Sequence, residues 1–155
     1  MQPAELERYL HEHIPLSQAM RASVVAADAK SVVLRAPLAP NINHRETVFG
    51  GSAASLAILA AWSLLHVRLL AEGLSPRLVI QRSSMDYDAP MAGAFEARSF
   101  LAEPGHWPRF THMLAHKGKA RIAVNSVLEI DGQPAGRFSG DFVAISAPGM
   151  PGSGP

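Results

Sequence analysis

Apolar residues along this chain change their spacing several times, and each change marks a structural element. In residues 3–13, Leu6 and Leu10 form one narrow stripe, which predicts a short helix that Pro15 ends. Short apolar and β-branched runs between turn residues predict strands. These strands are expected over residues 24–27, 31–36, 78–87, 94–101, 109–116, 121–130 and 136–145, with a hairpin turn at Asp131 and Gly132.

One segment is apolar on almost every side. Val48 to Leu65 is eighteen residues without a charge, which is long enough for a membrane span to be considered. The segment opens with two glycines, and its serines fall on one stripe with His66, so we interpret it as a helix buried by a sheet. Ser52 is predicted to cap its start, and Gly73 to end it in the left-handed conformation.

A single apolar helix needs a sheet to cover it. The elements therefore predict an α+β domain over residues 1–146, in which an antiparallel sheet wraps one long central helix. The remaining residues, 147–155, are rich in glycine and proline and are expected to form a disordered tail.

Composition narrows the class of protein. The chain has 155 residues, of which 48% are hydrophobic and 17% charged, and this suits one globular domain. The net charge of +1 gives no reason to expect nucleic acid or an anionic membrane as partner. With no cysteine, disulfides, cysteine nucleophiles and thiolate metal sites are excluded. The N-terminus lacks the apolar run of a signal peptide, so a cytoplasmic location is expected.

Residues 78–87 carry polar side chains on both faces of the expected strand. Strict alternation groups Val79, Gln81 and Ser83 on one face and places Asp86 on the other. A strand buried on one face would be apolar there, so one face is predicted to line a site or an interface.

The start of the long helix is the first candidate for chemistry. Gly50 and Gly51 allow the backbone to come close to a bound group just before the helix. A helix start has free N–H groups and a partial positive charge, which together suit a developing oxyanion.

Two stretches carry a family resemblance. Residues 43–52 read Asn-His-Arg-Glu-Thr-Val-Phe-Gly-Gly-Ser, and residues 83–90 end in Tyr87-x-x-Pro90. A loop, two glycines, a long helix and this strand resemble the hotdog-fold acyl-CoA thioesterases, above all those of the YiiD C-terminal type. The likeness runs from about residue 15 to 145. It implies a hotdog domain, a homodimer or dimer of dimers, an acyl-CoA or acyl carrier protein thioester as substrate, and no metal or other cofactor.

The resemblance also implies site residues. Asn43 would hold the attacking water or the thioester carbonyl, His44 would act as a base, Gly51 would bind the carbonyl oxygen, and Ser83 would help to position water. Each has a simpler alternative: Asn43 caps a turn, His44 is an exposed loop residue, Gly51 allows tight packing, and Ser83 is a small packed residue. The residues expected to contact substrate are Phe49, Gly50, Ser52 and Ser55.

One departure from the family pattern concerns the catalytic acid. Related thioesterases carry Asp or Glu where this chain has Ile58, and the central helix has no carboxylate before Glu72. Carboxylates that could substitute are Glu46, Asp86 and Asp88. The departure leaves a second hypothesis open, a non-catalytic domain that binds acyl-CoA or an acyl chain, or an accessory dimerisation module. A hotdog hydratase or dehydratase is a third hypothesis, but its His and acid motif is not found.

Other catalytic motifs are not found. His112 and His116 lie in a predicted strand, which would separate them by about 13 Å, so no metal site is expected from them. There is no Gly-x-Ser-x-Gly elbow, phosphate-binding loop or dinucleotide fingerprint.

Overall fold

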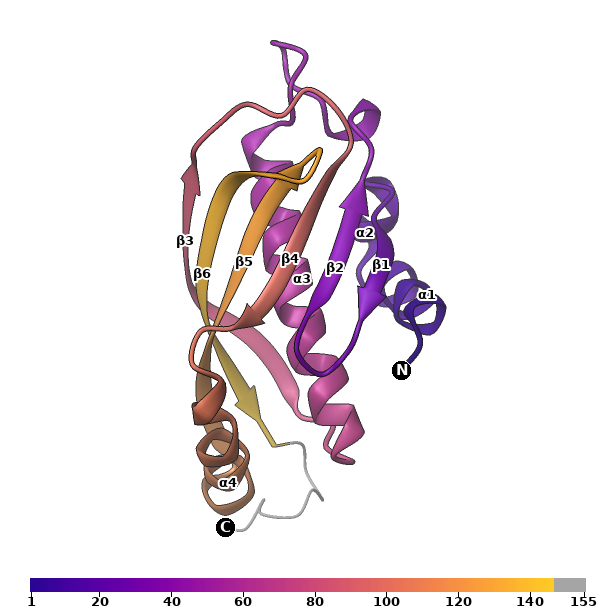
Figure 1. Ribbon diagram of the computed structural model, residues 1–155. Helices are drawn as coiled ribbons and strands as arrows, with labels where there is room; N and C mark the ends of the chain where they lie inside the picture. Colours follow the sequence, from indigo (N-terminus) through magenta and orange to yellow (C-terminus); the bar gives the residue numbers. More distant parts are fainter. Residues whose placement is uncertain (147–155) are drawn as a thin grey trace.

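The computed structural model describes residues 1–146; the predicted disordered tail lies outside the described residues. Six strands form one antiparallel sheet in the order β1-β2-β4-β5-β6-β3 (Figure 1). The helices are α1 (Pro3–His13), α2 (Pro15–Ala19), α3 (Gly50–Ala71) and α4 (Trp107–Lys117), with short 3-10 turns at Ala39–Asn41 and Pro104–His106. The strands are β1 (Ser23–Ala27), β2 (Val32–Ala36), β3 (Arg77–Tyr87), β4 (Phe95–Leu101), β5 (Lys119–Ile130) and β6 (Gln133–Ile145).

The long helix α3 lies against one face of the sheet and forms the centre of the core. Leu56, Leu64 and Leu65 are fully buried, as are Phe95 and Phe142 of the facing strands. This arrangement confirms the predicted α+β fold with one central helix. By length and composition α3 could also cross a membrane, but 61% of its most apolar window is buried inside the molecule. The enclosing sheet accounts for that apolarity; that the chain does not span a membrane stays a prediction.

The start of α3 differs from the predicted one. The helix begins at Gly50 after Phe49, and no side chain of the described residues caps it, so the predicted Ser52 cap is wrong. The backbone before the helix is fixed instead by two hydrogen bonds, from Val48 N–H to the Met91 carbonyl and from Phe49 N–H to the Asn41 carbonyl. These bonds hold Phe49 extended, so the helix begins two residues earlier than Ser52.

The end of α3 matches its prediction. The helix ends at Ala71, and Gly73 follows with a φ of +73°. The hairpin between β5 and β6 is also confirmed, since Asp131 and Gly132 have φ angles of +49° and +75°. Both positive angles suit the two-residue hairpin turns that match the twist of paired strands.

The strand predicted over residues 109–116 is wrong, because this segment belongs to helix α4. Trp107, Phe110 and Leu114 are buried and recur three and four residues apart, which places them on one face of a helix. Gly118, with a φ of +71°, ends the helix. The helix α4 packs against β5 at one end of the sheet (Figure 1).

The edge strand β3 contains a bulge that the sequence pattern does not reveal. Ile80 pairs with Phe142 and Ser83 pairs with Gly140, with a register shift between Ile80 and Arg82. Ile80 therefore shares the α3-facing side of the strand with Ser83, and the predicted grouping of Val79 and Gln81 with Ser83 is wrong. Beyond the bulge the alternation holds.

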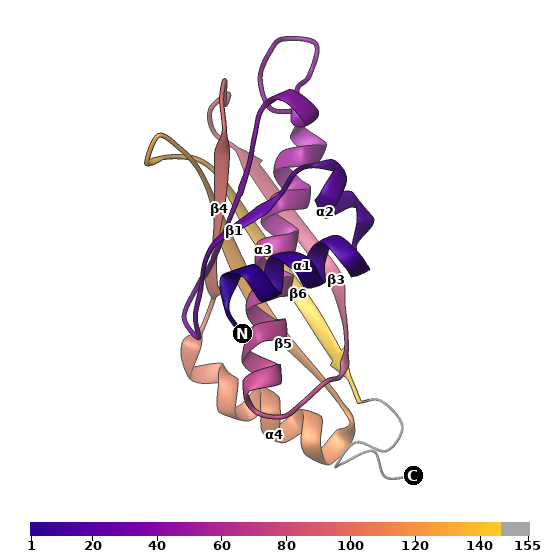
Figure 2. The same cartoon turned by 90° about the vertical axis from the view of Figure 1, so that its right-hand side faces the viewer.

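Helices α1 and α2 lie in front of α3 in the view of Figure 2, and α1 packs against the edge strand β1. An aromatic stack joins α1 to α3. The ring of Tyr9 lies between the rings of His13 and His66, with centroid distances of 4.1 and 4.5 Å, and Trp62 stacks on His66 at 4.8 Å. This stack anchors α1 and thereby positions the segment of residues 14–20 beside α3.

Candidate functional site

The loop before α3 is organised by Asn43. Its side-chain Oδ1 accepts hydrogen bonds from the backbone N–H groups of Arg45 and Thr47, at 2.8 and 3.1 Å. Its Nδ2 donates to Thr47 Oγ1 at 3.0 Å. Both polar atoms of the amide are thus engaged within the loop, which is the geometry of the turn-capping alternative. His44 is exposed in the same loop. The catalytic roles of both residues stay predictions.

Asn41 is a buried anchor of the loop before α3 that the sequence did not reveal. It is 2% exposed, and its Nδ2 donates to the carbonyls of Met20 and Pro37 at 3.0 and 2.8 Å. Its own carbonyl accepts the Phe49 N–H at 2.7 Å. One residue therefore joins the end of α2, the end of β2 and the start of α3. The only local signal was an asparagine following two prolines, which indicates a turn and not a buried anchor.

The first residues of α3 have free backbone donors. Gly50, Gly51 and Ser52 occupy the first turn, so their N–H groups have no acceptor within the helix. The ring of the half-exposed Phe49 lies over Gly51, where an added Cβ would stand 2.5 Å from Phe49 Cε1. Tyr87 Oη donates to the Gly50 carbonyl at 3.2 Å. The helix start is therefore bordered by two aromatic rings.

A pocket of about 220 Å³ lies beside α3, between the segment 14–20 and the edge of the sheet. Eight of the ten residues that line it are apolar, and the other two are Ser17 and Ser55. We call it the apolar pocket; its lining is Ile14, Leu16, Ser17, Met20, Ser55, Ile58, Leu59, Trp62, Ile80 and Phe142. Ser55 is thus the predicted substrate contact that the structure places in this pocket.

The apolar pocket and the helix start lie on one side of α3. Gly51, Ser55, Ile58 and Trp62 follow one another at spacings of four, three and four residues, which is one stripe of a helix. Four residues of helix rise about 6 Å, so Ser55 lies about one turn below Gly51. The pocket therefore extends along α3 from just below the free N–H groups.

No ionisable side chain is among the residues that line the apolar pocket. Ile58, which stands where the resemblance implies a catalytic acid, is part of its wall. Of the substitute carboxylates, Asp86 and Asp88 form ion pairs with Arg137 at 3.8 and 3.1 Å. The hydrogen bond and charge of Asp88, together with the charge of Asp86, raise the pKa of Arg137. Glu46 lies in the exposed loop with a φ of +63°.

Two other predicted site residues, Gly50 and Ser83, lie outside the apolar pocket. Gly50 lines a second cavity of about 270 Å³ together with Tyr87 and Asp88. Ser83 is exposed on β3 opposite Gly140, on the strand face that looks toward α3, and Asp86 lies on the opposite face. Because Asp86 and Ser83 face opposite sides of β3, they cannot serve one pocket of the same chain.

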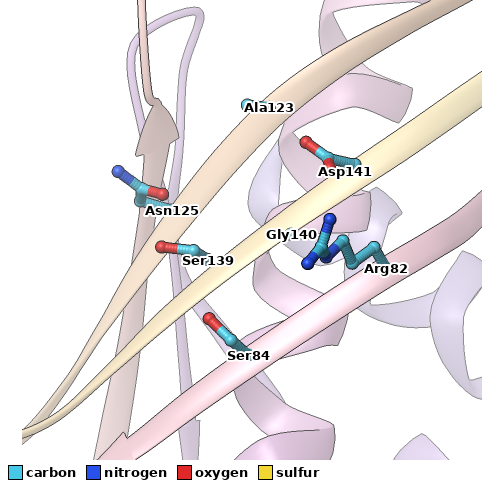
Figure 3. Close-up of a pocket in the computed structure, with 7 residues that line it drawn as sticks. All are labelled: Arg82, Ser84, Ala123, Asn125, Ser139, Gly140 and Asp141. Carbon is cyan, nitrogen blue, oxygen red and sulfur yellow. The ribbon is translucent and has the colours of Figure 1, made fainter.

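The sheet face away from α3 has a hollow of a different kind (Figure 3). This polar hollow, of about 190 Å³, lies across β3, β6 and β5. Arg82 and Asp141 are cross-strand neighbours there, as are Ser84 and Ser139. The full lining is Arg82, Ser84, Ala123, Asn125, Ser139, Gly140 and Asp141. None of the predicted site residues is among them.

His112 and His116 require a correction. They lie one turn apart on α4, and their ring centroids are 4.0 Å apart, so the argument that a strand separates them is wrong. Residues 1–146 contain no group of three or more His, Asp or Glu side chains that could hold a metal ion. The pair therefore has no third ligand within the described residues.

Comparison with known proteins identifies the family. Residues 3–146 match the family model described as "Putative thioesterase (yiiD_Cterm)". The chain belongs to this family. The resemblance inferred from the loop and the glycine pair is therefore confirmed.

Solved structures confirm the hotdog fold. A protein of unknown function from Chlorobaculum tepidum is 27% identical, with a TM-score of 0.86 over 94% of this chain and 98% of that one. A "putative thioesterase" from Shewanella oneidensis is 25% identical, with a TM-score of 0.79 over 92% and 96% of the two chains. A probable thioesterase from Pseudomonas aeruginosa, 20% identical with a TM-score of 0.78 over 94% and 97%, adds support for the fold alone.

Proposed function

We propose that this chain hydrolyses thioesters of acyl-CoA or acyl carrier protein, with the acyl chain in the apolar pocket. The observation that carries the proposal is the common stripe of α3: free N–H groups at Gly51 and Ser52 stand at one end, and an apolar cavity begins one turn below. In the substrate, the acyl chain begins directly at the thioester carbonyl. A carbonyl bound at the N–H groups would therefore direct the acyl chain into the cavity. Membership of a thioesterase family supports the same reaction.

The chemistry requires a water molecule and stabilisation of negative charge. Water attacks the thioester carbonyl carbon, its proton passes to a base, and negative charge builds on the carbonyl oxygen. The N–H groups of Gly51 and Ser52 would stabilise that charge, helped by the positive end of α3. The C–S bond then breaks, the carboxylic acid forms, and the sulfur leaves as a thiolate that takes up the proton.

The base is proposed to come from outside the wall of the apolar pocket. His44 and Glu46 lie in the loop beside Asn43, which would hold the water after releasing its bond to Thr47. A second chain could also supply the base, by pairing with the edge of β3 that is not bonded to β6. All of its eleven residues but Leu78 and Met85 are exposed, and open edges are commonly closed by pairing with another chain. We therefore propose a homodimer, or a dimer of dimers, that brings partner residues to the site.

The test is thiol release from acyl-CoA and acyl carrier protein thioesters of increasing chain length. Asn43→Ala should lower kcat/KM by about a hundredfold, as does loss of a group that positions water or an oxyanion. Asn125→Ala in the polar hollow is the matched control and should leave kcat/KM within about twofold. Thermal unfolding of both variants separates a lost role from a lost fold. Unchanged turnover in Asn43→Ala, with the loop intact, would remove Asn43 from the mechanism.

A second candidate function has an observation in its favour. Ile58 stands in the pocket wall where relatives carry the acid, and the described wall has no ionisable group. A domain that binds an acyl chain without hydrolysing it would have such a pocket. Saturable binding of acyl-CoA with no thiol release at any chain length would favour this candidate.

A further inference from the structure

We propose that the apolar pocket selects acyl chains that carry an oxygen, as a hydroxyl or keto group, some carbons beyond the thioester. This inference rests on the proposed placement of the acyl chain in the pocket and concerns its specificity. The geometry points to two residues, Ser17 of α2 and Ser55 of α3, which are the only lining residues of the pocket with hydroxyl groups.

Ser17 is the main observation. It is 1% exposed, lines the apolar pocket, and its Oγ has no hydrogen-bond partner among residues 1–146. A buried hydroxyl without a partner costs about 1–3 kcal/mol, and such groups in folded proteins call for an explanation. An oxygen on a bound acyl chain would supply the missing partner.

Two other buried serines show what a structural role looks like in this chain. Ser126 Oγ donates to the Ala57 carbonyl at 2.8 Å, and Ser99 Oγ donates to the Val32 carbonyl at 3.2 Å. Both hydroxyls are satisfied by the main chain of a neighbouring element. Ser17 has no such bond within the described residues. Ser63 Oγ also lacks a partner there, but Ser17 lines the apolar pocket and Ser63 does not.

Ser55 places a second hydroxyl in the same pocket. It is half-buried and lies about one turn of α3 below Gly51. The only other lining side chain with a strong hydrogen-bonding group is Trp62, and its Nε1 already donates to the Leu78 carbonyl at 3.1 Å. Ser17 and Ser55 thus remain to recognise a substrate oxygen, and both can donate to a carbonyl or exchange bonds with a hydroxyl.

Selectivity follows from the unpaired state of the buried Ser17 hydroxyl. A plain alkyl chain would leave this hydroxyl unpaired, whereas an oxygenated chain would supply its missing partner. Sites that hydrogen-bond a substrate group discriminate strongly against analogues lacking it. The pocket volume of about 220 Å³ lies below the 300–1,000 Å³ usual for drug-sized ligands, which favours a short or medium chain.

The experiment compares matched substrates and matched variants. Thiol release is measured with octanoyl-CoA and with its analogues hydroxylated at C3, C5 or C7. We expect kcat/KM for one analogue to exceed that for octanoyl-CoA by about tenfold, the worth of one hydrogen bond to a buried hydroxyl. Ser17→Ala should bring this ratio to within about twofold, because kcat/KM for the hydroxylated analogue falls toward the value for octanoyl-CoA.

Ser63→Ala is the control. Ser63 is also fully buried with an Oγ that lacks a partner among the described residues, but it is not part of the pocket wall, so the ratio should stay at the wild-type value. Equal kcat/KM for plain and hydroxylated chains in the wild type would overturn the inference. So would a preference that survives in Ser17→Ala with a normal unfolding midpoint.

Failure of the proposed function is distinguishable from failure of this inference. If no thioester is hydrolysed, the same pairs are compared by equilibrium binding, using fluorescence of the chain's two tryptophans, of which Trp62 lines the pocket. Tighter binding of a hydroxylated chain that Ser17→Ala abolishes would retain the inference for a binding domain. Equal binding of all chains would end it.

Discussion

The two faces of the sheet carry hollows of similar size and opposite chemistry. The apolar pocket on the α3 side has a volume of about 220 Å³ and two hydroxyls, whereas the polar hollow on the outer face has about 190 Å³ and includes a guanidinium, a carboxylate, an amide and hydroxyls. The face with more polar groups is nevertheless the poorer candidate. Exposed charges are solvated and screened, while a few donors in an apolar setting act at low dielectric.

The largest difference in unfolding free energy is expected when one asparagine on each face of the sheet is replaced by leucine. Asn41 on the α3 side is buried and bonds the Met20 and Pro37 carbonyls, so Asn41→Leu would leave both without their donor. We expect a loss of unfolding free energy of about 3 kcal/mol, measured by chemical denaturation. Asn125→Leu in the polar hollow should cost less than about 1 kcal/mol, because the Asn125 side chain is only partly buried and lines an open hollow. Equal losses of unfolding free energy in the two variants would contradict the proposed difference between a desolvated α3 side and a solvated outer face.

The next largest difference in unfolding free energy is expected when an aspartate is introduced on each face of the sheet. Ile58→Asp would put a charge into the apolar pocket and should cost on the order of 2 kcal/mol and weaken acyl binding. Val127→Asp on the outer face would stand between Arg98 and Arg137, its cross-strand neighbours, and should cost clearly less. Denaturation and acyl-CoA binding measure both. A rise in turnover in Ile58→Asp, despite the lower stability, would show that the pocket lies at the thioester.

The sequence predicted most of the fold because its signals were local. Eighteen uncharged residues identified the central helix, and Asp131-Gly132 identified the last hairpin. Helix α4 was missed because its apolar positions are separated by Arg, Thr and His in a short run between turn residues. The bulge at Gln81 was missed because a register shift belongs to a strand pair and not to one strand.

The site was less predictable for a related reason. The loop 43–52 and the glycines carry a motif, so the helix start could be named from the sequence. Asn41 and Ser17 carry none, because their importance depends on carbonyls, cavities and missing partners that come from distant elements. Ser55 could be placed on the right stripe of α3 by helical spacing, but only the structure shows the pocket that it lines.

Titration offers a smaller test on the α3 side. Burial lowers the pKa of His66, and the nearby charge of His13 lowers it further. The folded chain therefore takes up a proton on His66 less readily than the unfolded chain. The contribution of neutral His66 to the unfolding free energy is full above about pH 6.5, the ordinary histidine pKa, and is lost as the pH falls below it. His66→Phe keeps a stacked ring without a titrating group. The fall in unfolding temperature between pH 7.5 and 5.5 should be smaller in this variant; an equal fall would assign the effect to other histidines.

The smallest effect is expected in the polar hollow on the outer face of the sheet. Arg82 and Asp141 are neighbours across β3 and β6, and no ion pair links them in the described structure within 4.0 Å. Arg82→Ala and Asp141→Ala should therefore change the unfolding free energy by less than about 0.5 kcal/mol. Thiol release should stay within about twofold, since neither side chain can reach through the sheet to the apolar pocket. A loss of turnover as large as that of Asn43→Ala would place part of the site on the outer face, and the argument from desolvation would then fail for this fold.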